Sequence, residues 1–134
     1  MLYSAETWSL TKREENRLAV AQRRMGRIMT GTSLRQQKTN DWLRKRARIN
    51  HFMRSYQQRK SRWTQRISKM VEDRWARRVT EWHPRIGKRE RPKKCWRDEI
   101  VKVAGVRWMA IARNEESRWR QLEEIFLNLE AAVN

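Results

Sequence analysis

Apolar residues recur at intervals of three and four along most of this sequence, and nowhere do they alternate one by one. Intervals of three and four place side chains on one face of an α-helix, whereas a half-buried strand requires alternation. One such series, which we expect to face a core, consists of Phe52, Tyr56, Trp63, Ile67 and Met70. The pattern predicts an all-α protein, an irregular multi-helix bundle with one basic loop.

The clearest helix is expected between Thr11 and Gly31. Thr11 and Glu14 have the spacing of a capping box, and Gly31 can end the helix in the left-handed conformation. Apolar residues recur through it at three and four: Leu18, Ala21, Met25, Ile28 and Met29. The opposite face carries Arg17, Arg23, Arg24 and Arg27, which by default is a solvated face.

Further helices follow from the same signals. Asn40 can cap a short helix and Asn50 can open a longer one. A third helix around residues 72–82 ends before Pro84, because the residue before a proline is disfavoured in a helix. Another begins at Trp96 and stops at Gly105, and the rest forms one or two helices with a candidate break at 113–117.

A chain of 134 residues has the size of one domain. We expect a thumb-like helical region at 1–83, a basic loop at 84–95, and a helical region at 96–134 that packs on the first. Large aromatic side chains each bury about 150 to 250 Å². We therefore assign six tryptophans to packing: Trp63, Trp75, Trp82, Trp96, Trp108 and Trp119.

The positive charge lies in the first hundred residues. They hold 28 Lys or Arg and 10 Asp or Glu, while residues 101–134 hold five of each, so the net charge of +18 arises before residue 101. Such a field attracts polyanions, namely nucleic acid, an anionic membrane surface or an acidic protein. Arginine is the more frequent cation and favours nucleic acid, because its guanidinium group fits phosphate.

Signals for catalysis and metal binding are missing. There is no phosphate-binding glycine loop, no H-E-x-x-H helix and no paired C-x-x-C, and Cys95 is the single cysteine. His51 and His83 have no acidic or cysteine neighbours at ligand spacing. We expect no catalytic residues, no metal, no cofactor and no small-molecule substrate. Without a signal peptide or an apolar run, we expect an intracellular protein, nuclear or cytoplasmic, that is neither secreted nor membrane-bound.

Several motifs, read in order, resemble one known family. They are "LYSAETW", "LTKREENRLAVAQRRMGRIMTGTSLR", "KSRWTQRISKM", "DRWARRVTEWHPRIGKR", "RPKKCWRDEI", "VAGVRWMAIA" and "WRQL", which span residues 2 to about 122. This order is similar to the carboxy-terminal region of endonuclease-reverse transcriptases from non-LTR (LINE-type) retrotransposons. In that family "WTQR" at residues 63–66 is usually Trp-Ala-Gly-His.

The resemblance implies a remnant that holds the helical thumb and the basic linker behind it. The catalytic parts of the polymerase and the endonuclease lie upstream in the family, so an enzyme is not expected. The implied partner is RNA, DNA or an RNA–DNA hybrid, and the oligomeric state is left open.

We expect phosphate contacts without base reading. The first candidates come from the basic loop and its end: Arg85, Lys88, Arg89, Arg91, Lys93, Lys94 and Arg97. The second candidates belong to the helix after Asn50: Arg59, Lys60, Arg62 and Arg66. Two alternatives stay open. One is a helix-turn-helix DNA-binding module built on the helices after Asn40 and Asn50; the other is a retroelement fragment without a function.

Overall fold

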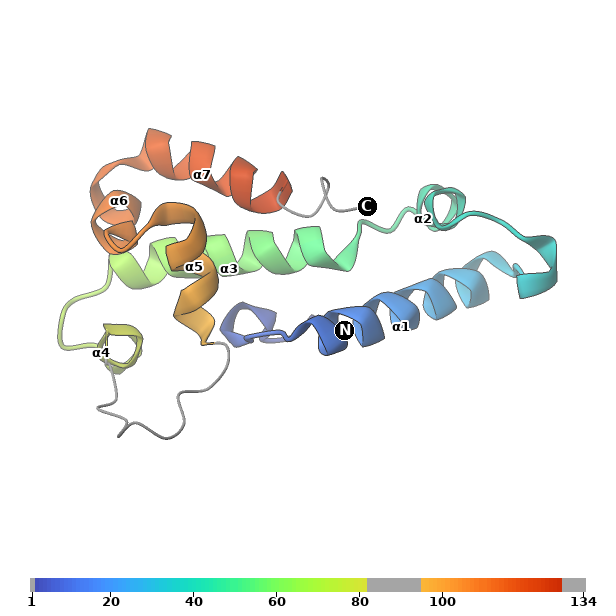
Figure 1. Ribbon diagram of the computed structural model, residues 1–134, viewed down its shortest axis with the longest axis horizontal. Helices are drawn as coiled ribbons and strands as arrows, with labels where there is room; N and C mark the ends of the chain where they lie inside the picture. Colours follow the sequence, from blue (N-terminus) through green and yellow to red (C-terminus); the bar gives the residue numbers. More distant parts are fainter. Residues whose placement is uncertain (1, 82–94, 129–134) are drawn as a thin grey trace. The chain divides into compact units, whose positions relative to one another are not determined.

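The structure is a computed structural model that describes residues 2–81 and 95–128 (Figure 1). Within these ranges the chain forms helices and no strand, which confirms the all-α prediction. The α-helices are α1 (Lys12–Thr30), α2 (Asn40–Ala47), α3 (Phe52–Ser68), α4 (Trp75–Glu81), α5 (Trp96–Ala104), α6 (Trp108–Asn114) and α7 (Glu116–Asn128). Two short 3-10 helices, η1 (Ala5–Thr7) and η2 (Leu34–Gln36), flank α1. None of the described helices has the length and apolar character of a membrane span.

The chain divides into two compact units. Unit 1 comprises Met1–Leu2 and Leu10–Tyr56, and unit 2 comprises Tyr3–Ser9 and Gln57–Asn134. One boundary between the units therefore falls inside α3, between Tyr56 and Gln57.

Both ends of α1 follow the local sequence signals. The Thr11 hydroxyl accepts a hydrogen bond from the Glu14 backbone N–H at 3.4 Å, and the Glu14 carboxylate accepts one from the Thr11 backbone N–H at 2.7 Å. At the other end Gly31 has a φ of 63°, and its N–H points to the carbonyls of Arg27 and Ile28. The predicted capping box and glycine stop are both confirmed, because they depend only on residues close in sequence.

Unit 1 is held together on one side of α1. This side packs against α2, and its buried residues are Gln22 and Gly26. The Gln22 side chain donates to the Asn50 carbonyl at 2.7 Å and accepts from the Phe52 backbone N–H at 3.3 Å. The Gln22 side chain thus provides hydrogen-bond partners for two backbone groups at the start of α3. These hydrogen bonds explain why a glutamine is buried at a position where an apolar residue would be expected.

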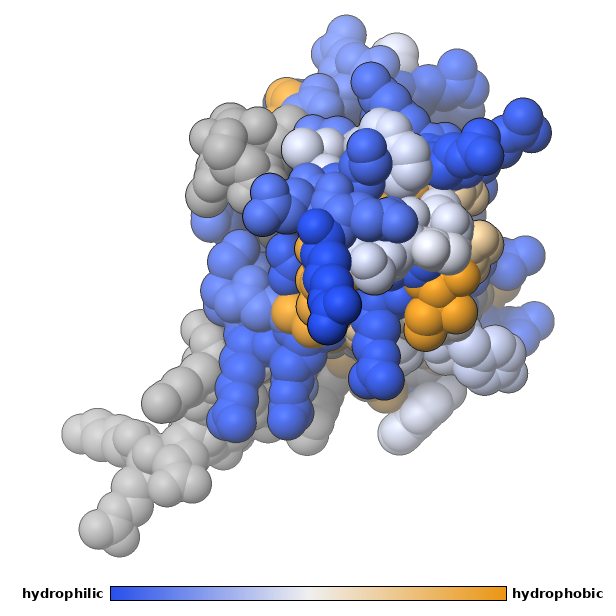
Figure 2. All heavy atoms as spheres, turned by 90° about the vertical axis from the view of Figure 1, so that its right-hand side faces the viewer, coloured by the Kyte–Doolittle hydropathy of each residue, from blue (hydrophilic) through white to orange (hydrophobic). Residues whose placement is uncertain are grey.

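The apolar stripe of α1 faces solvent, contrary to the usual placement of such a stripe. Ile28 is 71% exposed, Met29 is 66% exposed and Met25 is 40% exposed. The contacts of Gln22 and Gly26 fix which side of α1 turns inward. Met25 and Ile28 lie about 60° and 120° around the helix from Gln22, whereas Met29 is on nearly the same side as Gln22 but two turns further along. In Figure 2, which faces the end of α1, η2 and α2, hydrophobic atoms appear among the hydrophilic side chains.

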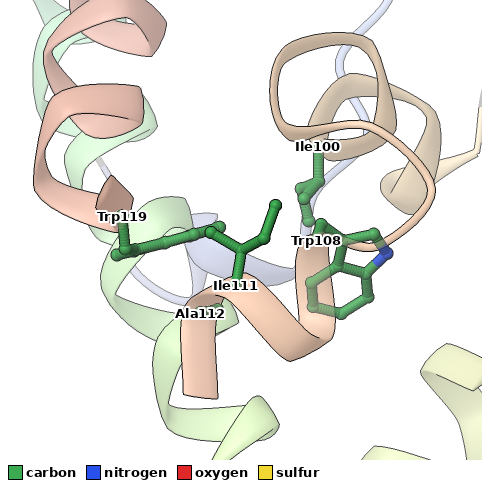
Figure 3. Packing of buried hydrophobic residues seen from close by; sticks show 5 residues of the cluster. All are labelled: Ile100, Trp108, Ile111, Ala112 and Trp119. Carbon is green, nitrogen blue, oxygen red and sulfur yellow. The ribbon is translucent and has the colours of Figure 1, made fainter. Parts of the chain in front are cut away.

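Unit 2 contains a compact cluster of buried apolar side chains. A cluster of buried side chains from α5, α6 and α7 consists of Ile100, Trp108, Ile111, Ala112 and Trp119 (Figure 3). Trp96 meets Trp108 edge to face, with ring centroids 6.5 Å apart. The Trp96 indole N–H also donates to the Glu6 carbonyl at 2.6 Å, which ties the segment before α1 to α5. Aromatic side chains therefore supply much of this core, as the sequence predicts.

The tryptophans differ in burial. Trp108 and Trp119 are buried and Trp63 and Trp96 are half-buried, whereas Trp82 lies outside the described residues. The packing prediction is wrong for Trp75, which is 76% exposed. Arg77 is the reason, because its buried guanidinium donates to the Met70 carbonyl at 2.9 Å and to the Glu81 carboxylate at 3.1 Å. Residues two positions apart in a helix point to nearly opposite sides, so an inward Arg77 turns Trp75 outward.

Candidate nucleic-acid interface

One of the seven first-choice cations, Arg97, belongs to the described residues. Arg85, Lys88, Arg89, Arg91, Lys93 and Lys94 lie outside the described residues. Arg97 is described and lies half-buried in the first turn of α5. Its neighbour Cys95 donates its backbone N–H to the Asp98 carboxylate at 2.9 Å, which caps α5. The described part of the site is therefore on the helices.

One face of α3 in unit 2, together with the residue directly after this helix, carries four exposed cations. They are Arg59, Arg62, Arg66 and Lys69, and we call this set the α3 basic face. Their intervals of three, four and three residues align them along the helix, and at a rise of 1.5 Å per residue they span about 15 Å. None of the four makes an ion pair with another described residue. The face thus presents uncompensated positive charge in a row.

The opposite side of α3 explains why these cations point outward. Tyr56 and Ile67 are each 1% exposed, and Thr64 and Ser68 are fully buried. The predicted core series of this helix is confirmed, with Trp63 and Met70 half-buried at its margin. Burial of one side leaves the other side to the charged residues. Three of the second-choice residues, Arg59, Arg62 and Arg66, are therefore on one accessible surface.

The prediction that Lys60 contacts phosphate is wrong. Its side chain is completely buried and its ammonium forms an ion pair with Glu99 of α5. The same nitrogen donates to the Trp8 carbonyl at 3.3 Å and lies 5.4 Å from the centre of the Trp96 ring. Lys60 follows Arg59 by one position, which turns it about 100° around α3 into the interior. It is thus a structural cation and is not available to a phosphate.

Unit 1 has a second row of exposed cations, two of which, Arg17 and Arg24, belong to the face that the sequence analysis expected to be solvated. Arg13, Arg17 and Arg24 are exposed on α1, and none of them pairs with a described acid. The signal was present in the sequence as arginines at intervals of four and seven. Such a spacing does not by itself indicate a binding site, because charged residues on the outside of a helix are the ordinary case.

Two observations concern metal ions and small ligands. No three His, Cys, Asp or Glu side chains among them form a group that could hold a metal ion. A hollow in unit 2 has a volume of about 20 Å³ and is lined mainly by apolar side chains of α5 and α7, together with Ser61 and Thr64 of α3. This volume has room for about one water molecule.

The chain is similar to a transposon-derived protein of Caenorhabditis elegans. The two are 25% identical over 131 residues. The match covers 87% of this chain and 47% of that protein, so the chain spans about half the length of its relative. No protein-family profile matches the sequence, and no solved structure matches it.

Proposed function

We propose that this chain is a transposon-derived module that binds nucleic acid through its phosphates without reading the bases. The observation that carries the proposal is the α3 basic face, four exposed cations in a row without acidic partners among the described residues. The similarity to a transposon-derived protein supports such an origin. The narrower proposal is a thumb and linker remnant of a LINE-type reverse transcriptase that lacks the catalytic parts.

The physical basis is counterion release. Each phosphate that a protein cation neutralises frees condensed counterions, so the logarithm of the binding constant falls by about 0.9 per contact for each unit of log salt on duplex DNA. The α3 basic face offers up to four such contacts. Cations of residues 84–97 would add to this number in the complex. Because phosphates are common to all strands, RNA, DNA and hybrids are all expected partners.

A salt-titrated binding series tests the proposal. We would measure binding of the wild-type chain and of the triple variant R59Q/R62Q/R66Q to single-stranded, duplex and hybrid oligonucleotides by fluorescence anisotropy. The variant should lose affinity on every probe, and its slope against log salt on duplex DNA should decrease by about 2 to 3, because three phosphate contacts are removed. An unchanged slope would contradict the role of α3.

A matched control separates local contacts from net charge. K102Q/R118Q/R120Q removes the same number of charges from exposed positions in α5 and α7. Arg118 and Arg120 already pair with Glu115 and Glu116 at 3.1 and 2.8 Å. We expect this control to keep the wild-type slope. If both triple variants lost the same affinity and slope, the positive charge would act on nucleic acid only through the overall electrostatic field of the chain.

The helix-turn-helix alternative requires α3 to act as a recognition helix. A recognition helix contacts base edges with its N-terminal residues. In this structure Phe52, Met53 and Tyr56 of that part of α3 are buried, which favours binding without base reading. Competition between scrambled and candidate duplexes tests this alternative, since only a sequence reader keeps a preference. The alternative of a fragment without function predicts thermal unfolding without cooperativity and no stable protein in cells.

A further inference from the structure

The exposed stripe of α1 has the spacing of a coiled-coil seam. Leu18, Ala21, Met25 and Ile28 follow one another at three, four and three residues, which are the a and d positions of two heptads. We call these four residues the α1 seam. Ala21, Met25 and Ile28 are exposed and Leu18 is half-buried. Such a narrow apolar stripe is the surface that one helix offers to another.

The charges beside the α1 seam indicate the kind of partner. In this register Arg17 and Arg24 occupy the two g positions, and both are exposed without an acidic partner among the described residues. The e positions are Gln22 and Met29. Gln22 is buried and bonded to the start of α3, whereas Met29 is exposed and widens the stripe. Flanking positions of a coiled coil pair with opposite charges on the partner helix.

We infer that the α1 seam docks an amphipathic helix of another protein whose flanking positions are acidic. Apolar side chains of that helix would cover Met25 and Ile28, and its carboxylates would pair with Arg17 and Arg24. The seam extends over about 15 Å of helix. The interface is therefore small, and we expect a transient complex. This surface is on α1 and is independent of the proposed phosphate contacts of α3.

Two other occupants fit these observations less well. In an antiparallel pair of copies, g positions face each other, so Arg17 would meet Arg24 of the second chain, and two chains of charge +18 would also repel. Helices that lie in a membrane interface usually carry Trp, Phe or Leu on the apolar face. The exposed stripe of α1 consists of Ala, Met and Ile instead. An acidic helix satisfies both the apolar and the charged parts of the surface.

The test uses a labelled synthetic four-heptad peptide with Leu at a and d and Glu at e and g. Its binding to the full chain is measured by fluorescence anisotropy, beside a scrambled peptide of the same composition and a version with Lys at e and g. The chain variant M25S/I28S removes the apolar part of the seam at exposed positions, so folding should persist and is checked by circular dichroism. V20S is the matched control, because Val20 is 56% exposed and lies at position c.

We expect M25S/I28S to weaken binding of the Glu peptide at least about tenfold, and V20S to leave it within about twofold, since only the seam contacts the peptide. R17E/R24E should shift the preference from the Glu peptide to the Lys peptide. Equal binding of the ordered and scrambled peptides would overturn the inference. A dimer detected by sedimentation and abolished by I28S would also overturn the inference, because a second copy would then occupy the seam. Binding to phosphatidylserine vesicles that depends on the seam, without binding to the peptide, would overturn it as well. Nucleic-acid binding should be unchanged in M25S/I28S, so failure here is distinguishable from failure of the proposed function.

Discussion

Replacing Glu99 by Gln should destabilise unit 2 strongly, because Lys60 would be left as a buried charge without its counterion. Lys60 has no exposed side-chain surface, whereas the Glu99 side chain is 16% exposed. Breaking a buried ion pair by removing one partner costs about 3 to 5 kcal/mol. The Trp8 carbonyl at 3.3 Å and the Trp96 ring at 5.4 Å remain near the ammonium, which favours the lower end of that range.

The expected loss for E99Q is therefore about 3 kcal/mol of unfolding free energy, out of the roughly 5 to 15 kcal/mol typical of a domain. For a chain of this length such a loss lowers the melting temperature by roughly 10 °C. We would measure thermal and urea unfolding by far-UV circular dichroism. E124Q is the matched control, because Glu124 is exposed on α7 and forms no ion pair with a described residue.

The substitution K60M tests whether the loss of stability in E99Q comes from the uncompensated charge of Lys60. K60M removes the buried charge itself and leaves Glu99 with access to water, so it should cost less than E99Q. Adding K60M to E99Q should restore part of the lost stability, since neither position 60 nor position 99 then carries a charge. If the double variant is less stable than E99Q alone, the cost does not come from an uncompensated charge and the explanation is refuted.

Two further predictions concern unit 1. G26A should stabilise the chain by about 0.5 to 1 kcal/mol, because a Cβ at this helical position meets nothing within 4 Å and enters a hollow of about 20 Å³ beside α2; a lower urea midpoint would contradict this. Burial, and secondly the charge of Arg44, lower the pKa of His51 below its ordinary value of 6.5. At acidic pH the unfolded chain therefore binds more protons at His51 than the folded chain does. The contribution of His51 to the free energy of unfolding is complete above about pH 6.5 and decreases as the pH falls below 6.5. The neutral Nδ1 accepts from the Met53 N–H at 3.3 Å, and H51Q should reduce the loss of melting temperature between pH 7.5 and 5.5.

The sequence alone determined several helix ends, although the cap of α2 is Thr39 and the prediction of Asn40 is wrong. The cap of α1, its glycine stop, the stop of α5 at Gly105 and the break between α6 and α7 all depend on side chains within a few residues of each other. Such signals act through local hydrogen bonds and backbone conformation, which are the same in any tertiary context. The core face of α3 was also predictable, because its series of large apolar residues is long and regular.

The tertiary structure alone decided which faces are covered. Lys60 was expected at the surface and is buried, while Trp75 and the α1 seam were expected to pack and are exposed. In each case a distant or polar partner made the difference: Glu99 for Lys60, the Met70 carbonyl for Arg77 beside Trp75, and the start of α3 for Gln22. Periodicity shows that a helix has a distinct face, but only the neighbouring elements determine whether that face meets protein or water, because burial is a property of contacts between segments far apart in sequence.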